Sequence, residues 1–186
     1  MLERPVFITG CGRSGTTILG ETLSHHPSIA YLNEPRDIWE QVLPQSDIWS
    51  AEAIRNGKLY IDETSITEQN QTSLTNRFSS AIDAAGRQRL VEKLPENSFR
   101  MRFIEAVFPD AMFIHIIRDG REVARSIAQA CSANRFTEAP WYGIQDAKWQ
   151  LIRNYCQSTL AYRNLSSLCY SDYERGLLEW LSLIHI

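Results

Sequence analysis

Several features that would point to common classes of protein are missing from this sequence. Its four cysteines (Cys11, Cys131, Cys156 and Cys169) show neither CxxC spacing nor a His/Cys cluster, so we expect free thiols rather than a zinc site or disulfides. The net charge of −3 gives no general attraction to nucleic acid or to acidic membranes. No apolar stretch is long enough to span a bilayer. An anionic ligand therefore has to be held by a local basic site.

The chain also lacks internal repeats and low-complexity tracts. With 186 residues, of which 44% are hydrophobic and 22% charged, it has the size and composition of one soluble globular domain. The N-terminus carries charge at once and has only a short apolar run, which predicts a first strand rather than a signal peptide. The cytoplasm is therefore the expected compartment.

Segments typical of strands and of helices alternate along the chain. Short apolar runs predict strands at Val6–Thr9, Ile29–Leu32, Arg89–Lys93 and Met112–Ile117. Amphipathic spacing predicts helices at Thr16–Ser24, after an N-cap at Ser98, from Asp119 onward and over Tyr142–Tyr162. Residues 45–75 are polar and weakly periodic, which favours a loop or lid with short helical pieces. The alternation predicts a three-layer, P-loop-like α/β fold with a central parallel sheet flanked by helices.

Four charged side chains follow, or end, the predicted strands. Arg13 comes after the first strand, Glu34 after the second and Arg118 after the fourth, and Lys93 ends the third. The carboxyl ends of parallel strands meet at one edge of a sheet, where α/β proteins bind their ligands. We therefore expect these four side chains to gather at that edge.

A glycine-rich loop, residues 10–15, joins the first strand to the first helix. Its glycines let backbone amides surround an oxyanion, and the helix N-terminus adds partial positive charge. Nucleotide triphosphatase loops need a lysine where this chain has Thr16, whereas Arg13 lies inside the loop. A smaller anion such as a phosphosulfate fits this set, and the candidate binding residues are Gly12, Arg13, Ser14, Gly15, Thr16 and Thr17. The alternative is a turn that only links strand to helix.

A second candidate anion site follows the fourth predicted strand. Arg118 ends that strand, and Ser126 comes eight residues later, two turns into the next helix, so both side chains can face the same edge. A guanidinium grips a phosphate through two hydrogen bonds, and the serine hydroxyl adds a donor. The alternative is that Arg118 pairs with a carboxylate and Ser126 is an ordinary helix residue.

Three motifs in order resemble the sulfotransferase family that uses 3′-phosphoadenosine 5′-phosphosulfate (PAPS). PVFITGCGRSGTT resembles its 5′-phosphosulfate loop, and FIHIIRDGREVARS resembles its 3′-phosphate motif with Arg118 and Ser126 at the family spacing. Between them, the segment from Glu92 to Asn97 is similar to the family's K-x-P-x-N element. The resemblance covers roughly residues 5–127 and implies PAPS as co-substrate, with no metal required.

The resemblance also implies catalytic roles. Glu34 is expected to be the base that takes the acceptor's proton, as in the Golgi-type and many bacterial members, and Lys93 and Arg13 to stabilise charge on the leaving oxygen. The alternatives are a surface Glu34 paired with Arg36 or Arg13, and a solvent-exposed Lys93. The expected acceptor is a hydroxyl of a sugar, a phenol or another small molecule, and its pocket is expected to involve residues 40–80 and Trp141-Tyr142.

Family domains are usually longer, so residues 1–180 are expected to form a sulfotransferase domain that is incomplete at its C-terminus. Residues 181–186 break the preceding amphipathic pattern and resemble a translated sequencing adapter, which predicts a non-native tail. Two other functions stay open at this point. One is a P-loop kinase or nucleotide triphosphatase with Asp119 as its metal-binding acid, and the other is a non-catalytic, truncated PAPS-binding fragment. Nucleic acid is not expected as a partner, and the oligomeric state stays open.

Overall fold

The protein is an α/β structure built on a parallel sheet. The computed structural model describes residues 2–134, 137, 140–169 and 171–184. Within these residues the sheet has four parallel strands in the order β2-β3-β1-β4. The strands are β1 (Val6–Gly10), β2 (Ile29–Asn33), β3 (Arg89–Lys93) and β4 (Met112–Ile116). The predicted α/β fold with a central parallel sheet is confirmed, and each predicted strand is present to within one residue at either end.

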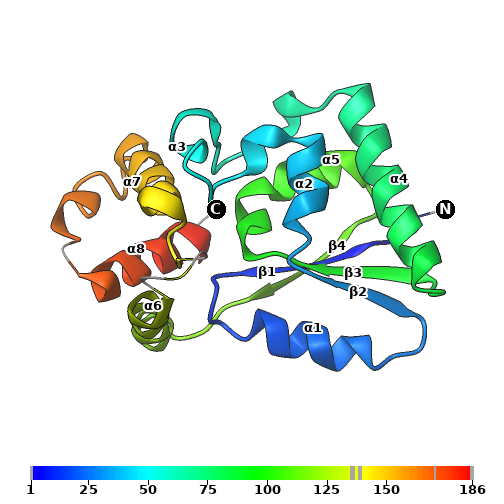
Figure 1. Ribbon diagram of the computed structural model, residues 1–186, viewed down its shortest axis with the longest axis horizontal. Coiled ribbons are helices and arrows are strands. Elements are labelled where there is room, and N and C mark those ends of the chain that lie inside the picture. The colour runs from blue at the N-terminus through cyan, green and yellow to red at the C-terminus, as the bar shows by residue number, and fades with distance from the viewer. Residues whose placement is uncertain (1, 135–136, 138–139, 170, 185–186) are drawn as a thin grey trace.

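Helices cover both faces of the sheet and extend beyond one of its edges (Figure 1). The α-helices are α1 (Thr16–Ser24), α2 (Arg36–Val42), α3 (Ala53–Asn56), α4 (Glu68–Ala84), α5 (Met101–Val107), α6 (Gly120–Asn134), α7 (Ala147–Ser158) and α8 (Asp172–Ile184). Short 3₁₀ helices lie at Pro44–Ser46, Glu63–Ser65, Pro95–Arg100, Ile144–Asp146 and Ser166–Leu168. Helix α1 lies on one face of the sheet, α2, α4 and α5 lie on the other, and α6, α7 and α8 lie beyond the carboxyl ends of the strands (Figure 1).

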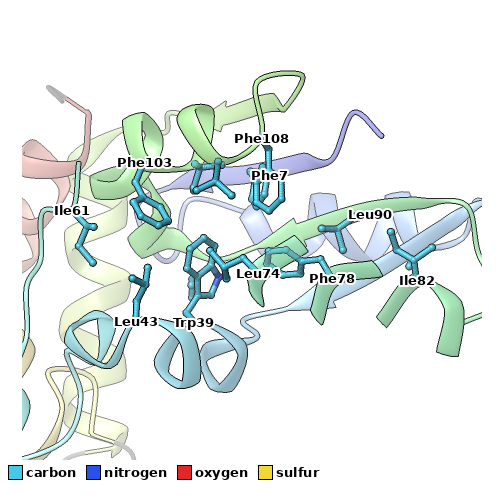
Figure 2. Close-up of a cluster of buried hydrophobic side chains, with 14 residues drawn as sticks. Phe7, Trp39, Leu43, Ile61, Leu74, Phe78, Ile82, Leu90, Phe103 and Phe108 are labelled. Atoms are coloured by element: carbon cyan, nitrogen blue, oxygen red, sulfur yellow. The ribbon is translucent and has the colours of Figure 1, made fainter. Parts of the chain in front are cut away.

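The central strand β1 is buried on both faces because successive side chains of a strand point in opposite directions. Phe7 packs into an aromatic cluster with Trp39 of α2 and Phe78 of α4, as Figure 2 shows. Val6 and Ile8 point the other way, into a smaller cluster that includes residues of α1. The continuous apolar run in the sequence is therefore explained by two covered faces.

Two predicted elements differ from the structure. Helix α4 begins inside the segment predicted to be a loop. The sequence did not reveal this helix because its buried apolar residues, Leu74, Phe78 and Ile82, form a narrow stripe among polar residues. Thr67 and Asn70 form a capping box that starts this helix, a local signal that the sequence does contain. The helix predicted over Tyr142–Tyr162 is shortened to α7.

Backbone geometry explains the later start of α7. Gly143, Gln145 and Asp146 all have left-handed φ angles (78°, 55° and 58°), which interrupt a helix before Ala147. The predicted N-cap at Ser98 is wrong: Ser98 lies inside a 3₁₀ helix, and its Oγ accepts a hydrogen bond from the Gly10 amide at 2.9 Å. This serine therefore supports the start of the glycine-rich loop instead of a helix end.

The C-terminal segment continues helix α8 through Ile184. Leu183 is buried in a hydrophobic cluster that also contains residues of α6 and α7. Residues 181–184 are thus packed in this structure, whereas 185 and 186 lie outside the described residues. The foreign origin of residues 181–186 stays a prediction. Among the described helices, none is both long enough and apolar enough to cross a membrane.

Candidate active site

The glycine-rich loop forms a cradle at the carboxyl end of β1. A Cβ atom on Gly10 would lie 2.4 Å from the Ile116 carbonyl oxygen, so only glycine fits where β1 passes β4. Gly15, with φ of 102°, is the N-cap of α1, and as a glycine it has no side chain that could accept a hydrogen bond from the first amides of the helix. The first amides of α1 are therefore available to an anion.

The buried Ser14 hydroxyl is a further feature of this cradle. Its Oγ has no hydrogen-bond partner within the part of the chain that the structure describes. A buried hydroxyl without a partner is costly, and a bound oxyanion would satisfy it. The donors of this loop therefore fit the phosphosulfate group that the sequence motif implies.

Glu34 lies at the centre of a charged cluster next to this loop. Lys93 Nζ is 2.6 Å from Glu34 Oε1, and Arg36 is 2.7 Å from Glu34 Oε2. Lys93 is only 1% exposed, so the alternative of a solvent-exposed lysine is wrong. Burial tends to raise the pKa of Glu34, but the hydrogen bond from Lys93 and the charges of Lys93, Arg36 and Lys148 outweigh it, and the pKa is lowered below 4.5. Glu34 is therefore a carboxylate at neutral pH.

The two candidate anion sites lie side by side. Arg13 Nε donates to Ser126 Oγ at 3.0 Å, and Arg118 donates to the Arg13 carbonyl oxygen at 3.3 Å. Arg13 thus bonds to Ser126 rather than forming the ion pair with Glu34 that was considered from the sequence. The structure brings Arg118 and Ser126 to one place, as the eight-residue spacing predicts.

Both Arg13 and Glu34 have backbone geometry that side chains rarely adopt. Their φ angles are 69° and 52°, in the left-handed region that favours glycine. The Glu34 amide donates to the Lys93 carbonyl at 2.7 Å, which holds the turn after β2 against β3. Such strain costs on the order of 1 kcal/mol or more at each residue, and it is typical of functional sites.

A cavity of about 430 Å³ lies between the glycine-rich loop and Glu34. Its loop side consists of Gly12, Arg13, Thr16 and Thr17, and Glu34 faces it as well. Trp49, Trp141, Ile144 and Lys148 also line it. The cavity is therefore bounded by an anion-binding loop, a carboxylate with cationic partners, and a wall of aromatic side chains.

The sequence analysis considered Arg36 only as an alternative partner of Glu34, and the structure does show that pair. Arg36 also stacks over the Trp49 ring, with 4.0 Å from its guanidinium carbon to the ring centre. Other residues of the site were missed. Lys148 and its partner Glu179 come from helices far along the chain, and no local spacing relates them to the loop. Trp141 and Tyr142, in contrast, were both predicted to shape the acceptor pocket. Trp141 does line the cavity, whereas Tyr142 is buried in a hydrophobic cluster and does not line it.

Glu92 was also missed, although a glutamate inside an apolar strand is a visible signal. It is fully buried and accepts hydrogen bonds from Trp39 Nε1 at 2.9 Å and from Asn97 Nδ2 at 2.8 Å. Burial nevertheless raises its pKa to about 8. The Asn97 Oδ1 atom has no partner among the described residues, and reversing that amide lets a protonated Glu92 donate to it.

Glu92→Gln is expected to flatten the dependence of stability on pH. A pKa raised from 4.5 to about 8 means that the folded protein binds the proton more tightly than the unfolded chain. The stability from this group is complete below pH 4.5 and is lost as pH rises towards 8, by about 1.4 kcal/mol per pH unit. Urea titrations of both proteins at several pH values measure the difference, with the exposed Glu105→Gln as control. If Glu92→Gln keeps the wild-type dependence of unfolding free energy on pH, the assignment of a protonated Glu92 is contradicted.

Among the described residues, no group of three or more His, Cys, Asp or Glu side chains could hold a metal ion. Asp119, the acid of the triphosphatase alternative, instead bonds to Arg121 through a 2.7 Å ion pair. Two histidines make contacts within the protein: His25 Nδ1 lies 2.9 Å from the Glu21 carbonyl oxygen at the end of α1, and His115 Nδ1 lies 2.9 Å from Thr9 Oγ1.

Known proteins are similar to this chain in sequence. A sequence model described as "Sulfotransferase family" matches residues 5–172. Protein-tyrosine sulfotransferase 1 of Danio rerio is 31% identical over 127 residues, which cover 66% of this chain and 34% of that protein. The Homo sapiens protein of the same name is 30% identical over 125 residues, covering 66% and 33%. The chain thus spans about a third of the length of these relatives.

Two solved structures are similar at low identity. Sulfotransferase STF1 of Mycobacterium tuberculosis has a TM-score of 0.41 at 17% identity, covering 98% of this chain and 59% of that chain. Sulfotransferase STF9 of Mycobacterium avium has a TM-score of 0.44 at 14% identity, covering 100% and 69%.

Proposed function

The chain belongs to the sulfotransferase family, and on this premise we propose that it transfers the sulfuryl group of PAPS to a hydroxyl acceptor. The observation that carries the proposal is the Glu34–Lys93 pair, 2.6 Å long, beside a cavity that the anion-binding loop also lines. A general base, a cation and a phosphosulfate cradle are the groups that an in-line sulfuryl transfer needs.

Two sets of residues would hold PAPS. Gly12 and the run from Arg13 to Thr17 would bind the 5′-phosphosulfate, with the free Ser14 hydroxyl and the uncapped N-terminus of α1 as donors. Arg118 and Ser126 would bind the 3′-phosphate. When bound, PAPS supplies the sulfuryl group and the adenosine 3′,5′-bisphosphate leaving group.

Glu34 would accept the proton of the acceptor hydroxyl. Its lowered pKa keeps it ionised, which is the state that a base requires. A low pKa also makes a weak base, so the contribution of Glu34 would depend on its being ionised and held close to the acceptor hydroxyl. Lys93 and Arg13 would offset the negative charge that grows on the leaving oxygen.

The acceptor would lie between Glu34 and the aromatic wall of the cavity. Trp49 and Trp141 line this part of the cavity, and aromatic side chains suit a phenol or the apolar face of a sugar. The relatives named protein-tyrosine sulfotransferase favour a phenolic hydroxyl as the first acceptor to try.

Ligand binding tests the nucleotide half of the proposal. Adenosine 3′,5′-bisphosphate at a hundred times its Kd is expected to stabilise the protein by about 2.7 kcal/mol, a shift of several degrees in Tm. Mg-ATP at the same concentration is expected to give no comparable shift, because the loop has Thr16 in place of the lysine that reaches the terminal phosphates. Stabilisation by Mg-ATP alone contradicts the proposal, and binding of the bisphosphate without transfer to any acceptor identifies a non-catalytic fragment.

A further inference from the structure

Two consecutive side chains of helix α8 reach two different parts of the site. Glu179 is 1% exposed, and its Oε1 lies 2.7 Å from Lys148 Nζ. The other carboxylate oxygen accepts a hydrogen bond from Trp141 Nε1 at 3.1 Å. Glu179 therefore binds two residues of the cavity wall at once.

Lys148 and Trp141 form the part of the wall that faces the glycine-rich loop. The Lys148 ammonium lies 4.6 Å from the centre of the Trp49 ring and 4.7 Å from that of Trp141, within range of cation–π attraction. A Cβ atom on Gly12 would lie 2.8 Å from the Trp141 ring, so the ring rests directly against the loop. The position of this wall is thus set by the Glu179 carboxylate.

Trp180, the next residue, contacts the other anion site. Its Nε1 donates to the Arg118 carbonyl oxygen at 3.0 Å. A Cβ atom on Gly120 would lie 2.6 Å from the Trp180 ring, so the indole also packs on the backbone after Arg118. Neighbouring residues of a helix point about 100° apart, which lets one helix contact both places.

The position of α8 is itself fixed by close packing. A Cβ atom on Gly176 would lie 3.0 Å from the Ala124 Cα atom, so α8 lies directly against α6. Helix α6 carries Ser126 and therefore belongs to the same anion site. The family match ends at residue 172, where α8 begins.

We propose that α8 positions both halves of the site through separate side chains. Glu179 fixes the acceptor wall through Trp141 and Lys148, and Trp180 fixes the backbone that presents Arg118 to the 3′-phosphate. This inference rests on the proposed function. Both are positioning residues, because neither has to touch substrate for the site to keep its shape.

Two variants test whether Glu179 and Trp180 act on separate parts of the site, and each is the other's control. Glu179→Gln removes the charge that pairs with Lys148, and we expect the KM for the acceptor to rise five- to tenfold while the Kd for adenosine 3′,5′-bisphosphate stays within twofold. Trp180→Phe keeps an aromatic ring on Gly120 but loses the hydrogen bond to Arg118, and we expect the opposite pattern. A variant that changes both constants by the same factor overturns the inference, since a helix that only stabilises the fold would do this.

Two further measurements separate the possible failures. The indole N–H signal of Trp141 in ¹H–¹⁵N spectra is expected to move in Glu179→Gln while that of Trp180 does not, and this needs no turnover. An unmoved Trp141 signal overturns the role of Glu179 even where PAPS chemistry stands. A wild-type protein that binds no bisphosphate contradicts the proposed function and the Trp180 role with it. The double variant Lys148→Met/Glu179→Gln removes the unpaired buried charge, so recovery of Tm in it shows that any loss of stability in Glu179→Gln comes from that charge.

Discussion

Glu34→Gln is expected to reduce the turnover of the proposed sulfuryl transfer about a thousandfold and to leave the affinity for adenosine 3′,5′-bisphosphate within threefold. The amide keeps the size of the side chain but cannot take the proton of the acceptor hydroxyl, and general bases contribute roughly 10²- to 10⁴-fold. Turnover with ³⁵S-labelled PAPS and calorimetric titration of the bisphosphate measure the two quantities separately.

The pH dependence of the wild-type protein gives a second view of the same residue. Because the pKa of Glu34 is lowered below 4.5, its carboxylate is present throughout the neutral range. Activity from this base is therefore complete above pH 4.5 and is lost only as pH falls through the lowered pKa. An acid limb of kcat/KM near pH 6 or above contradicts the assignment of Glu34.

The control for Glu34→Gln has to account for Lys93, which becomes a buried cation with a weaker partner. Some loss of stability is expected, so Tm is measured for every variant. Asp37→Asn, an exposed carboxylate on the same helix as Arg36, is expected to change neither turnover nor affinity. If affinity and turnover fall together in Glu34→Gln, its role is electrostatic or structural rather than that of a base.

Arg118→Ala is expected to weaken the binding of adenosine 3′,5′-bisphosphate by about 10- to 100-fold and to leave the binding of AMP nearly unchanged. Hydrogen bonds to charged groups contribute about 1.5–3 kcal/mol, and a guanidinium can make two of them to one phosphate. AMP lacks the 3′-phosphate and so cannot lose this contact. Competition calorimetry with both nucleotides gives the ratio of affinities that identifies the 3′-phosphate site.

Arg121→Ala is the matched control for Arg118→Ala. Its side chain lies on the same stretch of chain but is 81% exposed and pairs with Asp119, so we expect both affinities to stay within twofold. An equal loss of bisphosphate and AMP affinity in Arg118→Ala contradicts the 3′-phosphate role. It would indicate instead that Arg118 supports the loop through its hydrogen bond to the Arg13 carbonyl.

The sequence was sufficient to predict the sheet and the residues at its carboxyl edge. Each strand is a short apolar run that can be recognised from neighbouring residues alone. The parallel pairing of β2 with β3 then brings Glu34 beside Lys93. The same reasoning places Arg118 near the glycine-rich loop, because β4 pairs with β1 up to Gly10 and Ile116. The arrangement of these groups follows from topology, whereas their roles stay proposals.

Other parts of the site depend on tertiary contacts that no local pattern encodes. Lys148 is separated from Glu179 by a turn-rich segment, and only the packing of α7 and α8 makes them partners. The left-handed backbone at Arg13 and Glu34 is not one that arginine or glutamate favours, so residue preference does not predict it. The long helix α4 was missed because its three buried apolar residues are separated by polar residues along the sequence.

Transfer of ³⁵S from labelled PAPS to a panel of phenol, tyrosyl peptide, carbohydrate and lipid hydroxyl acceptors tests the central claim most directly. The wild-type chain is expected to label at least one acceptor class, and Glu34→Gln is expected to label it about a thousandfold more slowly. Absence of label on every acceptor, in a protein that binds adenosine 3′,5′-bisphosphate, contradicts the claim that this chain is a catalyst.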